Sequence, residues 1–316
     1  MTSTRPAPRR IAPARLGLLQ VSTAGVLWGT TGLALHVIHG RSDMAIVTIS
    51  SYRIGIAALI LLGMVAATRQ LGAVVEVLLR QPVVFVVVAL STMLVQTLFV
   101  YAVITVGVSV ATIVALGLAP VLTTAIESAR SRSLPSPSTW AVLTAGLSGL
   151  VLVSASAGGA TQSEHPLLGL VAAVATGVGY ALTTLLGRRL AQDTSATAVT
   201  AGTTAIGAVA LLPLGILGGA TGAPLVTADP VAVLALVYLG AVTMALAYWL
   251  LYAGLRAISG GAAVIATLIE PVAASVFAAV LLHERLGVNG VIGAVLILLA
   301  VAELHRAPTA GVPPPG

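Results

Sequence analysis

Residues 47–55 read VTISSYRIG, and residues 199–207 read VTAGTTAIG, so one short pattern occurs twice in the chain. Further matches follow at nearly the same separation, close to 151 residues: Leu62-Gly63 with Leu214-Gly215, Tyr101-Ala102 with Tyr252-Ala253, and Pro120 with Pro271. Gly, Thr, Tyr and Pro therefore recur in the same order. This internal repeat predicts two structurally similar halves.

The composition favours a membrane protein. Of the 316 residues, 58% are hydrophobic and 8% are charged, whereas a soluble domain carries roughly 25% charged residues. The 33 glycines are typical of membrane helices that approach one another closely. The chain has no Cys, which excludes disulfides, thiol catalysis and Cys-ligated metals.

Ten segments are long and apolar enough to span a bilayer, which takes about 20 residues. They lie near 16–37, 44–67, 83–105, 109–127, 138–157, 166–187, 197–217, 230–254, 262–282 and 288–304. The sequence predicts a disordered basic cytoplasmic tail (1–15), a first five-helix repeat (16–157), an extracytoplasmic linker (158–165), a second five-helix repeat (166–305) and a disordered tail (306–316). The first apolar run is longer than the apolar core of a signal peptide, so we expect it to be retained.

The arginines, the only basic residues besides histidine, indicate the orientation. With the N-terminus inside, only Arg41 and Arg285 fall outside, and Arg53 lies within a span. The cytoplasmic side receives the rest: Arg5, Arg9, Arg10, Arg15, Arg69, Arg80, Arg130, Arg132, Arg188, Arg189, Arg256 and Arg306. This asymmetry follows the positive-inside rule and predicts both termini in the cytoplasm. It also accounts for the net charge of +6 without a nucleic-acid partner.

An odd number of helices in each half makes the repeat inverted, because the second half enters the membrane from the opposite side. Two such halves can exchange conformations and open a central site to each side in turn. We therefore expect a multi-pass protein of the cytoplasmic (inner) membrane that acts as a secondary transporter by alternating access.

The second half carries motifs of a known family. It reads YWLLYAGL over 248–255, LIEPV over 268–272 and LLHERL over 281–286, followed by Gly290 and Gly293. In this order, and with the five-plus-five repeat, the chain resembles the EamA-like family of the drug/metabolite transporter superfamily over residues 16–305. The first half departs from the pattern, since Arg132-Ser133-Leu134 stands where the second half has Glu284-Arg285-Leu286. The resemblance implies a proton-driven or facilitated transporter, often an exporter of amino acids or other metabolites.

Arg53 and Glu270 are the charged residues predicted inside spans and away from the span ends. Arg53 lies about nine residues into its span, where a charge is costly unless it faces a cavity or a partner. It is either a receptor for a substrate carboxylate or a structural group paired inside the protein. Desolvation disfavours the charged form of Glu270, so this residue could carry a coupled proton, receive a substrate ammonium group or bond a neighbouring helix. Pro271, and Pro120 in the first half, predict helix kinks.

Aromatic and amide side chains complete the expected substrate site. Tyr248 and Tyr252 share a helix face, and Trp28 matches Tyr180 in the repeat. For each aromatic residue, the alternative to substrate binding is packing in the core. For the amide side chain of Gln96, the alternative is a polar contact between helices. The remaining candidates are Gln96 and Tyr101, and we expect Glu284 at a gate or interface beside Arg285. Glu127 is expected to pair with Arg130, and Gly25 with Gly29 predicts a close helix contact.

Two other classes of protein remain as alternatives: an intramembrane enzyme acting on a lipid-linked substrate, and a channel or structural membrane subunit. The acidic residues are scattered rather than clustered at one membrane face, which disfavours the enzyme. The sequence shows no Walker A loop, metal-ligand spacing or nucleophile with a base, so no cofactor and no metal are predicted. The expected partners are a small-molecule substrate, the lipid bilayer and a coupled proton, in a monomer or weak dimer.

Overall fold

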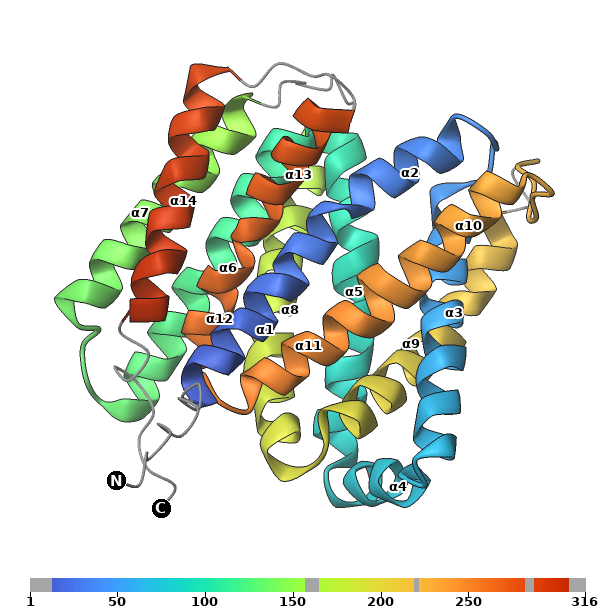
Figure 1. Cartoon of the computed structure of the whole chain (residues 1–316), viewed down its shortest axis with the longest axis horizontal. Coiled ribbons are helices and arrows are strands. Elements are labelled where there is room, and N and C mark those ends of the chain that lie inside the picture. The colour runs from blue at the N-terminus through green and yellow to red at the C-terminus, as the bar shows by residue number, and fades with distance from the viewer. Residues whose placement is uncertain (1–12, 157–164, 219–221, 282–286, 307–316) are drawn as a thin grey trace, which may run out of the picture.

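The computed structural model describes residues 13–156, 165–218, 222–281 and 287–306, all of whose regular elements are helices (Figure 1). The first half contains α1 (Pro13–Gly29), α2 (Thr31–His39), α3 (Ile46–Ala67), α4 (Leu71–Arg80), α5 (Pro82–Val106), α6 (Val108–Ser131) and α7 (Pro137–Ser156). The second half contains α8 (Pro166–Asp193), α9 (Ala196–Gly218), α10 (Pro230–Tyr238), the π-helix η2 (Leu239–Leu246), α11 (Ala247–Leu255), α12 (Gly260–Thr267), α13 (Ile269–Leu281) and α14 (Val288–Arg306).

These helices form ten stretches that are long and apolar enough to cross a membrane. The predicted all-α fold with ten membrane helices in two five-helix halves is confirmed. The described chain begins with α1 and ends with α14 toward the bottom of the bundle in Figure 1, and we call this end the termini end. The opposite end is called the far end. Besides the ten spans, the short helix α4 lies across the termini end, where the sequence predicted only a connection.

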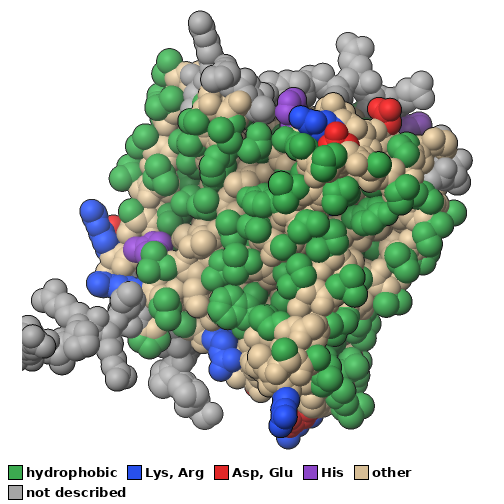
Figure 2. All heavy atoms as spheres, turned by 45° about the vertical axis from the view of Figure 1, so that its right-hand side comes forward, with side chains coloured by type: hydrophobic (Ala, Val, Ile, Leu, Met, Phe, Trp, Pro, Cys, Tyr) green, Lys and Arg blue, Asp and Glu red, His purple; other side chains and the backbone are tan. Residues whose placement is uncertain are grey.

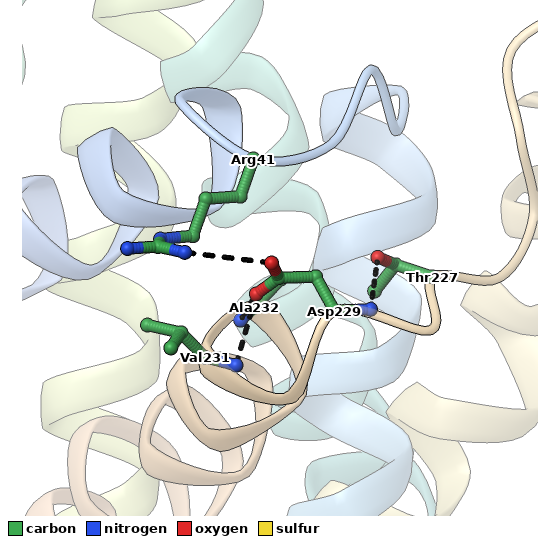
Figure 3. Close-up of polar contacts among 5 residues, drawn as sticks. All are labelled: Arg41, Thr227, Asp229, Val231 and Ala232. Carbon is green, nitrogen blue, oxygen red and sulfur yellow. Dashed lines mark hydrogen bonds and ion pairs between the residues drawn. The ribbon is translucent and has the colours of Figure 1, made fainter.

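Local sequence accounts for many helix boundaries. Proline, whose fixed φ suits the first helical turn, begins α5, α8 and α10. Asp229 caps α10 by accepting bonds from the backbone N–H groups of Val231 and Ala232, both at 2.9 Å. Its carboxylate also pairs with Arg41 at 3.4 Å, which joins the loop after α2 to α10 at the far end (Figure 3).

The outer surface is apolar between two charged rims. Figure 2 shows a broad belt of hydrophobic side chains, with charged residues gathered toward its edges. Leu59 on α3 and Val209 on α9 are 74% and 75% exposed. In water such a surface would cause aggregation, whereas a bilayer solvates it. Multi-pass insertion in a membrane follows from this belt together with the ten spans.

The two halves exchange their first helices. α8, which begins the second half, packs against α5 and α6 of the first half. In the same way α1 packs against α11, α12 and α13 of the second half. We call α5, α6 and α8 the first group, and α1, α2, α10, η2, α11, α12 and α13 the second group. The middle of the bundle lies between these two groups.

The two groups meet chiefly at the termini end. There α12 packs against α6 and α8, and α11 packs against α8. At the far end, α2 packs against α10 and α13, which belong to its own group. Within the described part of the chain, the main packing between the groups is thus on the termini side.

Three interruptions of regular helix fall in the second group. The first span breaks at Thr30, whose hydroxyl lies 2.8 Å from the Tyr238 hydroxyl. The eighth span widens into η2, and the ninth breaks at Leu268, three residues before Pro271. By contrast, α6 continues as a helix through Pro120. The two repeats therefore share a topology but differ in helix geometry, and the irregular turns lie along the middle of the bundle.

Candidate functional site

Arg53 of α3 lies at the centre of a hydrogen-bond chain that crosses the bundle. One terminal nitrogen, Nη1, donates to Gln96 Oε1 of α5 at 3.2 Å, and Nη2 donates to the Thr243 carbonyl of η2, also at 3.2 Å. A π-helix changes which backbone carbonyls are engaged within the turn and often marks a functional site. The irregular turn of the eighth span thus supplies an acceptor that helps to hold the guanidinium within the membrane region.

Gln96 carries the chain on to the aromatic residues. Its Nε2 donates to the Tyr248 hydroxyl of α11 at 3.1 Å. The Tyr248 ring meets Trp28 of α1 edge-on, with ring centroids 5.1 Å apart. Gln96 uses both ends of its amide, so its orientation is fixed by Arg53 on one side and Tyr248 on the other. Polar residues of both groups are in this way joined to one aromatic wall.

Tyr180 of α8 faces the same wall across a small cavity. Trp28, Tyr180 and Tyr248 line this cavity together with threonines of α5, α8 and α12. Its volume of about 10 Å³ is enough for one water molecule. The repeat partners Trp28 and Tyr180 therefore line one space, as their matched positions suggested. In the structure this space is small, and the two groups pack together on its termini side.

Several buried donors around the aromatic wall have no acceptor. Arg53 Nε, Trp28 Nε1 and the Thr183 hydroxyl make no hydrogen bond among the described residues. Trp28 and Thr183 both line the small cavity. Because buried donors are seldom left unpaired, these groups are candidates for contacts with a ligand.

Glu270 stands at the broken turn of the ninth span. Two glycines of α1 allow this turn to approach closely: a Cβ on Gly25 would lie 2.7 Å from Ile269, and one on Gly29 would lie 2.7 Å from the Glu270 carbonyl oxygen. The predicted close contact at these glycines is thus present, between α1 and α13. It fixes the backbone of Glu270 beside Trp28.

Arg53 and Glu270 lie near enough to interact electrostatically. They nevertheless form no ion pair, since the three ion pairs among the described residues are elsewhere. The Glu270 side chain is half-buried and its carboxylate accepts no hydrogen bond from the described part of the chain. The centre of the bundle thus holds one basic and one acidic side chain that are separate from each other.

Other predicted residues lie apart from this cluster. Tyr101 is 43% exposed on α5 and has no ring contact with the cluster. Tyr252 lies 6.5 Å from Tyr248, ring centre to ring centre, and is buried in the core on the termini side. Glu284 falls outside the described residues. Thr243, a member of the cluster through its backbone carbonyl, gave no sequence signal because any residue type offers that acceptor.

Glu127 does not pair with Arg130 as expected. Its two carboxylate oxygens accept hydrogen bonds from the backbone N–H groups of Gly260 and Gly261, at 2.7 and 3.1 Å. These amides begin α12, where the helix dipole favours a negative charge. The long-range cap replaces the local pair because it satisfies two amides that otherwise have no partner within the helix.

Comparisons with known proteins agree with this architecture. The chain matches the EamA-like transporter family over residues 15–155 and 167–304, one match in each half. It is 27% identical over 213 residues to the uncharacterized transporter YwfM of Bacillus subtilis (strain 168), covering 67% of this chain and 70% of that protein. A solved structure, described only as the crystal structure of a protein, superimposes with a TM-score of 0.74 at 20% identity, over 91% of this chain and 96% of the other.

Proposed function

Because the chain belongs to the EamA-like transporter family, we propose that it is a secondary transporter that exports amino acids or related small metabolites across the cytoplasmic membrane. The family and the named relative support a membrane transporter and point away from an enzyme. The substrate class is inferred from the separate charges of Arg53 and Glu270. These two charges are the observation on which the proposal rests.

The arginines indicate which end of the protein faces the cytoplasm. In the described part of the chain, Arg15, Arg69, Arg80, Arg130, Arg132, Arg188, Arg189, Arg256 and Arg306 lie at the termini end, whereas the far end has Arg41. The positive-inside rule assigns the arginine-rich end to the cytoplasm. On this assignment, the end at which the two groups pack together faces the cytoplasm.

An amino acid zwitterion complements the central charges. Its carboxylate would accept from Arg53, whose planar guanidinium suits two-point binding of carboxylates, and its ammonium group would face Glu270. Neither charge is already neutralised by the other, so the substrate replaces water rather than breaking an ion pair. The Trp28 and Tyr248 rings offer apolar surface for the side chain.

Glu270 also provides a means of coupling. We assign to it alternate occupancy by the substrate ammonium group and by a proton. A proton entering from the far end neutralises the carboxylate and releases the ammonium group to that side. One proton then moves inward for each zwitterion that leaves, and the proton gradient drives export.

Transport into inside-out vesicles tests both assignments. We expect saturable uptake of labelled amino acids, accelerated when the vesicle lumen is more acidic than the medium. Arg53→Ala should raise the KM about thirtyfold, the equivalent of roughly 2 kcal/mol for a hydrogen bond to a charged group. Glu270→Gln should lose the part of uptake that depends on the gradient while counterflow persists.

Matched controls are available on the surface. Arg189→Ala removes an exposed arginine at the end of α8, and Glu76→Gln removes a carboxylate of an exposed pair on α4. Both should transport like the parent protein. Saturable uptake with an unchanged KM in Arg53→Ala would refute the carboxylate site. An unaltered response to the gradient in Glu270→Gln would refute the coupling assignment.

A further inference from the structure

The turn that joins α11 to α12 is tied to the first group and its neighbourhood at the termini end. Glu127 of α6 caps Gly260 and Gly261, and Arg188 Nε of α8 donates to the Ile258 carbonyl at 2.8 Å. Arg256 Nη1 donates to the carbonyl of Thr194, just after α8, at 2.8 Å. Of these contacts, only that of Glu127 with Gly260 and Gly261 places a carboxylate between the two groups. Opening this end requires α12 to leave α6, and therefore requires the Glu127 cap to break.

A large cavity lies on the termini side of the contact between α6 and the start of α12. It encloses about 550 Å³ between the termini-side ends of α6, α7, α8, α12 and α14. Glu127, Arg130, Arg188 and Glu303 line it together with several serines. A space of this size accommodates a small metabolite. Its polar lining suits a water-filled mouth rather than a lipid-facing groove.

The small cavity beside Trp28 lies on the opposite side of this contact, toward the middle of the bundle. Gly261 and Leu185 line the large cavity, whereas Ala263 and Thr184, from the same two helices, line the small one. A Cβ on Gly260 would lie 3.1 Å from Glu127 Oε1 and 3.6 Å from Thr184 Cγ2. The capped start of α12 thus separates the two cavities by about one layer of residues.

We propose that the large cavity is the termini-side mouth of the transport path and that the Glu127 carboxylate, bound to the start of α12, holds this mouth shut. This inference rests on the proposed transport function and adds a gate to it. Glu127 acts on the substrate path through α12 and is a positioning residue. The mouth opens when α6 and α12 separate and the Glu127 carboxylate becomes hydrated in the cavity.

The repeat places no carboxylate at the position that is equivalent to Glu127 in the second half. Glu127 lies seven residues after Pro120, and the residue seven positions after Pro271 is Ala278. The far-end counterpart of the gate therefore lacks the group that caps the turn. This difference agrees with the packing of the two groups against each other at the termini end.

The absence of cysteine from the chain permits a direct test that does not require transport. Thr184, which is 4% exposed, is replaced by Cys as a reporter. The Thr184→Cys variant is treated with a small charged methanethiosulfonate from the termini side of inside-out vesicles. We expect slow modification with Glu127 present and modification about tenfold faster or more with Glu127→Ala, since two charge-assisted hydrogen bonds are lost. Arg130→Ala, which alters the same cavity without touching α12, should leave the rate unchanged.

A cross-link provides the second measurement. A Cβ on Gly261 would lie 3.9 Å from the Cα of Thr124, so Thr124→Cys with Gly261→Cys should form a disulfide when oxidised. Oxidation should abolish amino acid uptake, reduction should restore it, and each single variant should be insensitive to oxidant. An oxidised pair that still transports would overturn the gate, as would unchanged reporter modification in a monodisperse Glu127→Ala protein. Failure of amino acid uptake in the parent protein would count against the proposed substrate, while the modification rates would still decide the gate.

Discussion

At the scale of single residues, the hydrogen-bond chain around Arg53 holds one positive charge in a defined position. Arg53 is held by Gln96 and by the Thr243 carbonyl, and Gln96 is held in turn by Tyr248. An isolated charge inside a membrane costs several kcal/mol. These bonds lower that cost without neutralising the guanidinium. Arg53 therefore remains available to an anionic group.

Tyr248→Phe tests whether the outer member of the chain orients the inner ones. The variant keeps the ring contact with Trp28 and removes only the acceptor for Gln96. One such bond contributes roughly 1 kcal/mol, so we expect the KM for the substrate to rise about fivefold with little change in the maximal rate. Vesicle uptake measures both quantities. A Tyr252→Phe variant, which alters a buried ring on the termini side of the cluster, serves as the comparison, and an equal rise in its KM would contradict the orienting role of Tyr248.

Asp229 makes a second residue-scale prediction, outside the membrane region. The N–H groups of Ala232 and Val231, with Arg41, lower the pKa of its carboxyl below the usual 3.8 (Figure 3). The folded carboxyl binds its proton more weakly than the unfolded one. Its stabilising contribution is therefore complete above about pH 4 and is lost as the pH falls through the lower folded value.

Thermal unfolding in detergent between pH 6 and pH 3 measures this loss. We expect the Tm of the parent protein to fall more steeply below pH 4 than that of Asp229→Asn, because Asn caps a helix without titrating. Asp229→Ala should have a lower Tm than the parent at pH 6. Parallel pH profiles for the parent and the Asn variant would contradict the assignment.

At the scale of helices, the close contact of α1 with α13 positions Glu270. A Cβ on Gly29 would lie 2.6 Å from Ala273 Cβ and 2.9 Å from the Ala274 backbone nitrogen. Because backbone cannot move aside cheaply, Gly29→Ala should destabilise the protein by about 1–3 kcal/mol and displace Glu270. The Tm of thermal unfolding and the rate of gradient-driven uptake should both decrease. Gly32→Ala, three residues further along the same span, meets no atom within 4 Å and should preserve both.

The sequence predicted contacts that arise from repeat or spacing and missed those that arise from distant packing. The matched positions of Trp28 and Tyr180 placed them at one cavity, and the four-residue spacing of Gly25 and Gly29 indicated a helix contact. The expected partner of Glu127 was wrong because Arg130 is its neighbour on the helix, whereas Gly260 is 133 residues away. Such a cap cannot be read from local spacing.

Element boundaries show the same limit. The ten spans were predictable because each contains a long apolar run. The ten-residue helix α4 was missed because its length is below that of a span and its polar residues, such as Glu76 and Arg80, resemble a loop. The π-helix η2 was missed because its sequence, LGAVTMAL, contains no proline and suits an ordinary helix. The Thr243 carbonyl of this turn accepts a hydrogen bond from Arg53, a contact between distant residues that local sequence does not indicate.

At the scale of the whole molecule, the inverted repeat and the arginines make a prediction about orientation. An odd number of helices in each half leaves both termini on one side, and the charge asymmetry assigns that side to the cytoplasm. The proposed direction of export and the assignment of the closed end both depend on this orientation. It can be measured without any substrate.

Two single-cysteine variants report the orientation in intact cells. Asp43 is exposed at the far end, and Gln192 is exposed near the termini end. A membrane-impermeant maleimide should label Asp43→Cys in intact cells and should label Gln192→Cys only after the membrane is permeabilised, with the cysteine-free parent as the blank. The reverse pattern would place the termini outside. The cavity gated by Glu127 would then face away from the cytoplasm, and the same central charges would have to serve uptake instead of export.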